Sequence, residues 1–292
     1  MKNIVYILIL LLIPSFLSCA SNIAEKAGFT KEYIKAGDFT LMTYQKFDQH
    51  SDTLNIYIEG DGRAWVNKHT LSDDPTPSNP VALKLAAADP GSNIAYIARP
   101  GQYPMGQQHE GGCRLQLKGA VPFMQECSSK YWSASRFAPE VVSSMDQAIE
   151  QLKARSKTRY VQLTGYSGGG AIAVLVAARR GDVTALRTVA GNLNTVAWCN
   201  YHHISQLENS LNPLDAASRT VNIPQRHFVG GKDKIMPYVI AGSFVKSEGD
   251  IDESRISIVK NATHNNGWDK QWKELMLILP SPAVGRAREG GT

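Results

Sequence analysis

One short glycine-rich segment carries the pattern of a serine nucleophile. Residues 165–169 read Gly-Tyr-Ser-Gly-Gly, a G-x-S-x-G sequence centred on Ser167. The chemistry needs those glycines because the serine sits on a strained strand-to-helix turn, where flanking side chains would clash with neighbouring backbone. The context fits, since a β-rich VQLT precedes the turn and a small-residue run, GAIAVLVAARR, follows it. The alternative interpretation is a glycine-rich turn that only tightens a strand–helix connection.

Two later residues could complete a proton relay with Ser167. Asp233 lies in the polar turn of FVGGKDKIMP after an apolar run, and His264 lies between the last expected strand and the last expected helix. Where this motif supplies the nucleophile, its partners follow in the chain order serine, acid, histidine. The histidine would move the proton, and the acid would orient the imidazole ring. The alternatives are a turn or capping role for Asp233, Asp250 as the acid, and a solvent-facing His264.

A second glycine-rich turn could supply the oxyanion hole. It follows the apolar run TLNIYI and reads Glu-Gly-Asp-Gly over residues 59–62. An oxyanion hole of this kind takes one backbone N–H after the nucleophile and one from the loop after an earlier strand. We therefore predict Gly168 as the first donor and Asp61 as the second, with Gly62 as the next candidate. A metal-binding or capping carboxylate is the alternative role for Asp61.

Around these turns, apolar β-rich runs alternate with helical segments. We predict strands over residues 39–47, at a sheet edge, and over 53–59, 93–98, 160–164, 186–190, 227–229 and 256–259. We predict helices over residues 80–88, 137–153, 170–180, 238–246 and 268–279. The alternation predicts an α/β fold with a mostly parallel central sheet flanked by helices.

The segments outside this pattern suggest a domain organisation. Residues 101–136 and 192–220 fit neither a strand nor a helix well, and loops this long in a compact domain are usually lids or caps. We therefore expect one catalytic domain over residues 38–280 with these two cap-like insertions. Residues 19–37 are interpreted as a tether or first helical turn, and residues 281–292 as a C-terminal tail.

The N-terminus predicts export and a lipid anchor. Lys2 precedes an apolar run from residue 4 to residue 17, which is typical of a secretory signal and short for a membrane span. The run ends in Phe-Leu-Ser-Cys-Ala, which resembles a bacterial lipobox with Cys19 as the lipidated residue. That resemblance implies a signal peptide over residues 1–18. It also implies that the lipidated protein is sorted to the outer membrane, because Ala20 and not an aspartate follows Cys19. The alternative is a plain signal peptide cleaved near Ala20.

Three further cysteines fall in the exported part of the chain. Cys113 and Cys127 lie in one loop-rich stretch, so we predict that this pair forms a disulfide, which leaves Cys199 as a free thiol. The sequence alone leaves the pairing open. The chain contains no CxxC or paired Cys/His spacing that would suggest zinc, and we expect no metal and no cofactor.

Together the motifs resemble the α/β-hydrolase superfamily over residues 53–279. The Asp233 turn resembles the G-x-x-D-x-x-V-P acid turn of that superfamily, with Met236 in place of valine. More narrowly, YIEGDGRAW, RPGQY, YWS and the AGNL/SLNP stretch resemble exported proteobacterial α/β-hydrolase proteins of unknown substrate. The resemblance implies an α/β-hydrolase fold with cap or lid insertions, and catalysis by Ser167, Asp233 and His264.

Composition and charge limit the classes of binding partner that the sequence predicts. The 31 basic and 26 acidic residues leave a net charge of +5 without a long basic block, so nothing predicts nucleic-acid binding. We expect a lipid-anchored serine hydrolase of esters, acting on a small, lipid or acylated envelope substrate. The alternatives are a non-catalytic envelope binding or assembly protein on the same scaffold, and an acyltransferase or peptidase with the same triad. The oligomeric state stays open.

Overall fold

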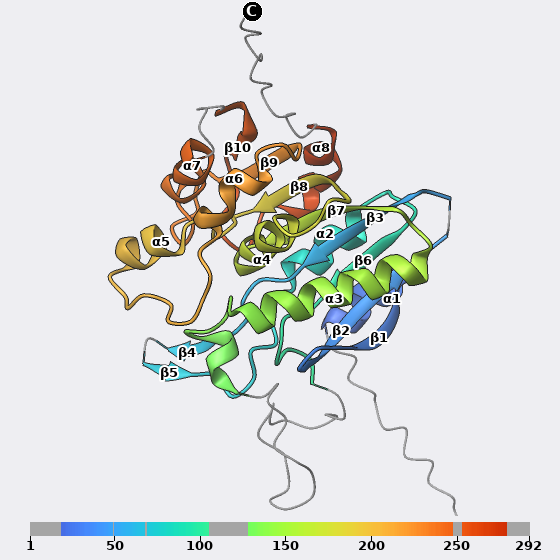
Figure 1. The fold of residues 1–292 in the computed structure, drawn as a ribbon, viewed down its shortest axis with the longest axis horizontal. Helices are drawn as coiled ribbons and strands as arrows, with labels where there is room; N and C mark the ends of the chain where they lie inside the picture. Colours follow the sequence, from blue (N-terminus) through green and yellow to red (C-terminus); the bar gives the residue numbers. More distant parts are fainter. Residues whose placement is uncertain (1–18, 49, 68, 105–127, 248–252, 279–292) are drawn as a thin grey trace, which may run out of the picture.

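Eight strands form one sheet whose order brings distant segments of the chain to a common edge. The computed structural model describes residues 19–48, 50–67, 69–104, 128–247 and 253–278. The strands of this sheet are β1 (Thr30–Ala36), β2 (Phe39–Lys46), β3 (Thr53–Ile58), β6 (Ile94–Ile97), β7 (Tyr160–Tyr166), β8 (Val183–Val189), β9 (Gln225–Gly230) and β10 (Ile256–Val259). Their order is β1-β2-β6-β3-β7-β8-β9-β10, and a separate hairpin pairs β4 (Trp65–Asn67) with β5 (Thr70–Leu71) (Figure 1).

In the sheet order, the strands from β6 to β10 are all parallel, whereas β2 pairs antiparallel with both β1 and β6. Parallel strands need crossover connections, which are usually helices. The helices are α1 (Cys19–Lys26), α2 (Val81–Ala88), α3 (Pro139–Ser156), α4 (Gly168–Ala177), α5 (Thr195–His202), α6 (Ala217–Thr220), α7 (Tyr238–Ser247) and α8 (Trp272–Leu277). The described residues also form short 3₁₀ helices: η3 (Ser129–Trp132), η4 (Pro213–Ala216), η5 (Glu253–Arg255) and η6 (Asp269–Gln271). This architecture confirms the predicted α/β-hydrolase fold class.

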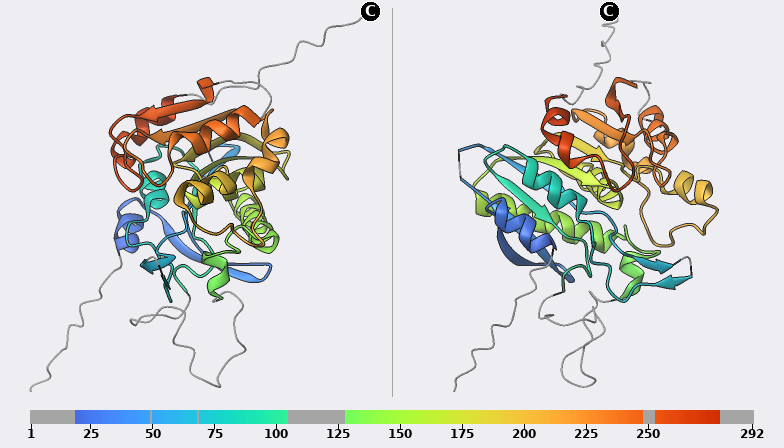
Figure 2. Two further views of the ribbon diagram at one scale, coloured as in Figure 1. Left: turned by 90° about the vertical axis from the view of Figure 1, so that its left-hand side faces the viewer. Right: turned by 180° about the vertical axis from the view of Figure 1, so that it is seen from behind.

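Helices cover both faces of the sheet and enclose two apolar cores. One core contains buried side chains of α3, α4, α6 and α7, and the other contains those of α1, α2 and α8. The side covered by α3 and α4 faces the viewer in Figure 1, and the side covered by α1 and α2 faces the viewer in the right-hand view of Figure 2. Alternate residues of a strand point to opposite faces, so Ile56 and Ile58 enter the first core and Tyr57 the second.

The strand order creates a switch point between β3 and β7. The chain leaves β3, passes through α2 and returns on one side as β6, whereas β7, reached through α3, pairs with the other side of β3. In open α/β sheets, ligands bind beyond the carboxyl ends of the strands at such a point. The turn at residues 59–62 and the turn at Ser167 both start there.

The predicted tether over residues 19–37 is wrong, because α1 and β1 occupy it. β1 pairs with β2 over its whole length, so β2 is an internal strand rather than the predicted edge. Edge strands carry few apolar residues, and β1 reads TKEYIKA, with only Ile34 and Ala36 buried. Ala20 and Ala24 of α1 are also buried, so this segment is part of the folded body.

The predicted cap segments have different outcomes. Residues 192–220 do contain regular structure, namely α5, η4 and α6. The side chain of Asn194 caps α5 by accepting from the Ala197 N–H, and His203 ends the helix in a left-handed conformation. Residues 105–127 of the other segment lie outside the described residues, as do Cys113, Cys127, Asp250, the signal peptide and the tail.

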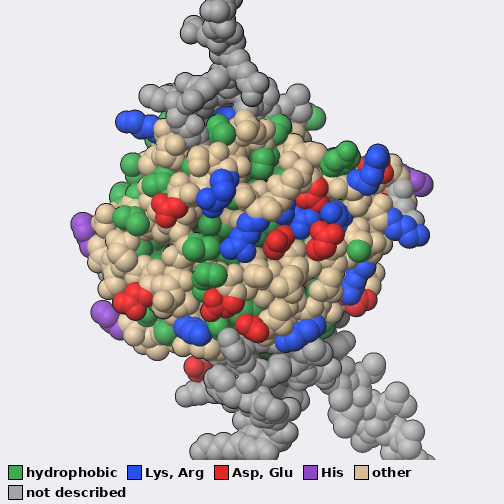
Figure 3. Space-filling view, in the orientation of Figure 1, with side chains coloured by type: hydrophobic (Ala, Val, Ile, Leu, Met, Phe, Trp, Pro, Cys, Tyr) green, Lys and Arg blue, Asp and Glu red, His purple; other side chains and the backbone are tan. Residues whose placement is uncertain are grey.

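On the face seen in Figure 3, basic and acidic side chains are intermixed, and no large patch of one sign is visible. Among the described residues, no helix is both long enough and apolar enough to cross a membrane. Cys199 of α5 is buried with a free thiol.

Candidate active site

Ser167 lies on a strained turn between β7 and α4. Its backbone has φ 51° and ψ −120°, a conformation that side-chain-bearing residues rarely adopt. The turn is possible because a β-carbon at Gly165 would lie 2.2 Å from the carbonyl oxygen of Gly169. Likewise a β-carbon at Gly169 would lie 2.2 Å from the carbonyl oxygen of Ile58 in β3. The G-x-S-x-G pattern thus reflects close backbone packing that presents Ser167 at the switch point.

His264 lies within hydrogen-bond distance of the serine. The loop after β10 places its Nε2 3.1 Å from Oγ of Ser167. Its backbone carbonyl accepts hydrogen bonds from the Trp268 indole at 2.9 Å and from the Tyr166 hydroxyl at 3.1 Å. The rings of Tyr166 and His264 also lie against each other, with centroids 5.3 Å apart. These contacts hold the imidazole over the nucleophile.

Asp233 completes the relay on the far side of the imidazole. Its Oδ2 lies 2.9 Å from Nδ1 of His264. Its Oδ1 accepts the backbone N–H groups of Ile235 at 2.8 Å and Met236 at 2.9 Å, which orients the carboxylate. The Asp233 side chain is fully buried, and that of His264 is 12% exposed. The structure therefore brings together Ser167, Asp233 and His264, the three residues that the sequence predicts as a triad.

The predicted oxyanion residues also lie at this point of the fold. A β-carbon at Gly60 would lie 3.1 Å from Cβ of Ser167, so the turn after β3 touches the nucleophile. The Gln102 amide donates to the Gly60 carbonyl at 2.9 Å and holds this turn. Within the described part of the chain, the backbone N–H groups of Asp61, Gly62 and Gly168 donate to no protein acceptor. These three groups are therefore available to a ligand, and their role as oxyanion donors stays a prediction.

Sequence reasoning missed two arginines beside this turn. Arg99 follows β6 and Arg136 precedes α3, and both approach the carboxylate of Asp61, at 3.2 Å and 2.8 Å. Burial lowers the pKa of Arg99 to about 10, which leaves it charged at neutral pH. Arg99 was visible only as part of the RPGQY resemblance, and Arg136 carried no sequence signal. The carboxylate of Asp61 is thus engaged in ion pairs, as a bridge between loops.

Glu59 lies buried beneath the same turn. Its Oε1 accepts the backbone N–H of Gly60 at 2.9 Å and that of Ala82, at the start of α2, at 3.4 Å. Burial raises the pKa of its carboxyl to about 7, and the backbone hydrogen bonds oppose this rise. Glu59 therefore links the turn after β3 to the N-terminus of α2.

This buried carboxyl predicts a pH-dependent stability. The folded-state pKa of Glu59 is raised from 4.5 to about 7, so its stabilising contribution is complete below pH 4.5 and is lost as the pH rises through 7. The loss amounts to about 3 kcal/mol. We expect the free energy of unfolding of Glu59→Gln, relative to the unmodified chain, to increase by about this amount between pH 4.5 and pH 8.

Urea denaturation at both pH values measures this difference. The control is Glu25→Gln, which removes an exposed glutamate of α1 by the same substitution. A Glu59→Gln difference that does not change with pH would show that this carboxyl does not titrate in the expected range.

A buried histidine lies outside this relay. His227 of β9 is fully buried, which lowers its pKa to about 3, and its Nδ1 lies 2.9 Å from the hydroxyl of Thr188. His227 therefore stays neutral and is not poised to accept a proton. Among the described residues, no group of three or more His, Cys, Asp or Glu side chains could hold a metal ion.

The fold and site geometry define a class: the chain has the α/β-hydrolase fold, with a serine, a histidine and an aspartate in hydrogen-bond contact at the carboxyl edge of the sheet. No protein-family model matches the chain, and no curated protein sequence matches it. Several solved structures of other proteins do match it. The acylaminoacyl peptidase of Pyrococcus horikoshii is 15% identical with a TM-score of 0.57, and the match covers 88% of this chain and 43% of the peptidase.

Two smaller proteins match over most of their own length. An esterase of Pyrococcus furiosus is 11% identical with a TM-score of 0.55, covering 86% of this chain and 90% of the esterase. An alpha-beta serine hydrolase homologue from Coxiella burnetii is 14% identical with a TM-score of 0.51, and the match covers 85% of this chain and 95% of the homologue. At this identity the likeness establishes the fold.

Proposed function

We propose that this protein is a serine hydrolase that cleaves carboxylic esters through an acyl-enzyme. One observation carries the proposal: an unbroken hydrogen-bond relay runs from Asp233 through His264 to Ser167, built from three separate loops. Nucleophile, base and orienting acid within hydrogen-bond reach are the signature of an activated serine. The strained backbone at Ser167 adds support, because such strain concentrates at functional sites.

Acylation would begin with attack by the serine oxygen. Oγ of Ser167 forms a bond to the acyl carbon while its proton moves to Nε2 of His264. The resulting imidazolium is stabilised by Asp233 through Nδ1. The imidazolium then returns the proton to the alkoxide oxygen as the ester C–O bond breaks, which releases the alcohol. Water next attacks the acyl-enzyme, with His264 again taking and returning the proton, and the free acid leaves.

The oxyanion of each tetrahedral intermediate would lie beside the nucleophile turn. Its donors are the backbone N–H groups of Gly168 and Asp61, with Gly62 as the alternative to Asp61. Gly168 is the first residue of α4, and the N-terminus of a helix favours negative charge. Preorganised donors of this kind are typically worth several kcal/mol in the transition state.

Esters are the proposed substrates, on chemical grounds. An alcohol leaves more readily than an amine, so the ester reaction asks less of the site. The matched structures include an esterase and an acylaminoacyl peptidase, so amide cleavage is the alternative outcome. The proposed location is the bacterial envelope, with Cys19 lipidated and an acylated or lipid substrate within reach. Since Ala20 and Ala24 of α1 are buried, an anchor at Cys19 would lie next to the folded body.

The test is labelling of the full chain with a fluorophosphonate probe, followed by peptide mapping. We expect one adduct, on Ser167, and slow labelling of His264→Ala because its serine lacks a base. Hydrolysis of short p-nitrophenyl esters should be lost when the adduct forms. No adduct on folded protein would contradict the proposal and favour a binding protein on a hydrolase scaffold. An adduct without ester hydrolysis would favour an acyltransferase or a peptidase.

A further inference from the structure

The mechanism above leaves one buried charge cluster beside the nucleophile unused. We propose that Arg99 and Arg136 are positioning residues that hold the carboxylate of Asp61 and so orient its backbone N–H toward the oxyanion. The inference rests on the proposed function for its kinetic consequence, and on the contacts of the cluster for its geometry. We name these three residues the Asp61 clamp.

The clamp joins three segments that are far apart in the sequence. Nη1 of Arg99, after β6, lies 3.2 Å from Oδ1 of Asp61, after β3. Nη1 of Arg136, before α3, lies 2.8 Å from Oδ2. Each carboxylate oxygen therefore has its own guanidinium, which fixes both the position and the rotation of the carboxylate. Charge-assisted hydrogen bonds of this kind are about twice as strong as neutral ones.

The arginines are themselves held by the surrounding backbone. Arg99 donates from Nη2 to the carbonyl of Arg136, and Arg136 donates from Nε to the carbonyl of Ser133 at 2.6 Å. Their guanidinium groups lie over aromatic rings, Arg99 over Phe137 at 5.4 Å and Arg136 over Trp198 at 5.7 Å. The arginine side chains are only 3% and 7% exposed. A clamp with this burial and support holds the turn rigidly.

The clamp also explains why glycine follows the nucleophile. A β-carbon at Gly168 would lie 2.1 Å from Oδ1 of Asp61, so the carboxylate occupies the space that a side chain would take. The backbone of Gly168 is an ordinary helix start, without a positive φ. Glycine is therefore required here by the clamp. The carboxylate packs against one predicted oxyanion donor, and its own backbone supplies the other.

Charge gives the arginines a second reason to be present. An isolated carboxylate next to the oxyanion would oppose the negative charge that develops in the transition state. Two guanidinium groups against one carboxylate leave the clamp with one net positive charge. The net positive charge of the clamp therefore stabilises the oxyanion, while the Asp61 carboxylate is the group through which the arginines fix the position of the turn.

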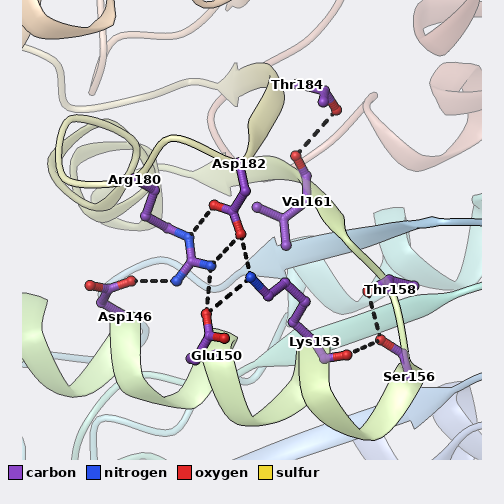
Figure 4. A network of polar contacts seen from close by, with 9 residues as sticks. All are labelled: Asp146, Glu150, Lys153, Ser156, Thr158, Val161, Arg180, Asp182 and Thr184. Carbon is purple, nitrogen blue, oxygen red and sulfur yellow. Dashed lines mark hydrogen bonds and ion pairs between the residues drawn. The ribbon is translucent and has the colours of Figure 1, made fainter.

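The chain offers a matched control for loss of a buried arginine. Arg180 is 8% exposed and pairs with Asp146, Glu150 and Asp182 at 2.6–2.8 Å (Figure 4). Asp182 directly precedes β8, so this network lies at the amino end of the strands, opposite the nucleophile. Arg180→Gln should lower stability without changing turnover per folded molecule.

The first test compares kcat and KM for p-nitrophenyl esters. We expect Arg136→Gln and Arg99→Gln to lower kcat about 10- to 100-fold, with KM changing less than about threefold, because a displaced oxyanion donor acts only in the transition state. Affinity for a phenylboronic acid, which forms a tetrahedral anion on the serine, should fall in parallel. Arg136→Lys keeps the charge and should recover part of the loss.

A second test moves the carboxylate and leaves both arginines intact. Gly168→Ala should displace Asp61 and lower kcat by a similar factor, about 10- to 100-fold. Asp61→Ala should lower kcat as well, and adding Gly168→Ala to it should cost little more. This non-additivity is expected of two positions that act through one contact.

Hydrogen–deuterium exchange separates failure of this inference from failure of the proposed function. A peptide covering residues 59–64 should exchange faster in Arg136→Gln and at the original rate in Arg180→Gln. Unchanged exchange and unchanged kcat in the Arg136 variant would overturn the clamp while leaving the hydrolase intact. If the unmodified chain neither labels nor hydrolyses esters, the proposed function fails, and the exchange rates still decide whether the arginines hold the turn.

Discussion

Ser167→Ala is expected to lower kcat for ester hydrolysis by a factor of about 10⁶, which leaves only slow background turnover. The reason is that the Ser167 hydroxyl is the one described side-chain group within hydrogen-bond distance of Nε2 of His264, so no second nucleophile is in place to replace it. Alanine adopts the same backbone as serine, so the turn between β7 and α4 should persist and the protein should stay folded. Initial rates with a p-nitrophenyl ester, measured at equal folded protein concentration, give the factor.

Ser156→Ala provides the control for that measurement. Ser156 is a buried serine at the end of α3 whose hydroxyl bonds to the Lys153 carbonyl and to Thr158, at the amino end of the sheet (Figure 4). Its substitution should change kcat less than about twofold. A Ser167→Ala variant that retained more than about one-hundredth of the activity would place the nucleophile elsewhere.

The catalytic constellation was predictable because two sequence signals are local. The glycines around Ser167 report a backbone approach that no other residue allows, so the turn is visible in five letters. Asp233 and His264 each follow a short apolar strand, and parallel strands deliver their following loops to one edge of a sheet. Chain order then selects them, although only the structure gives the distances of 2.9 Å and 3.1 Å.

The missed features depend on contacts between distant segments. β1 is polar because only one of its faces packs on the core, so it resembles a linker in sequence. α5 is capped by Asn194 and carries few buried residues, which leaves no helical periodicity to detect. Arg99 and Arg136 meet Asp61 only after β3, β6 and α3 have assembled. A buried ion cluster of this kind has no pattern along the chain.

Asp233→Asn is the second large effect, with kcat expected to fall about 10⁴-fold while the fold persists. Oδ1 of Asp233 accepts the backbone N–H groups of Ile235 and Met236, and the amide oxygen of asparagine can keep both bonds. Its NH₂ group then occupies the place of Oδ2 and donates to Nδ1 of His264. The imidazole must carry its proton on Nε2 instead, so it points a donor at Ser167 and cannot accept the serine proton.

The measurement is kcat for the same ester, together with fluorophosphonate labelling, which should slow by a comparable factor. Asp250→Asn tests the rival acid and should leave kcat unchanged if Asp233 orients the histidine. The opposite result, with Asp250 essential and Asp233 dispensable, would require a different partner for Nδ1 than the carboxylate at 2.9 Å. If Asp233→Asn loses activity but keeps its thermal stability, the carboxylate contributes to catalysis by fixing the tautomer of His264. The hydrogen bonds to the backbone that shape the turn are kept in this variant, so loss of the turn would not explain the lower kcat.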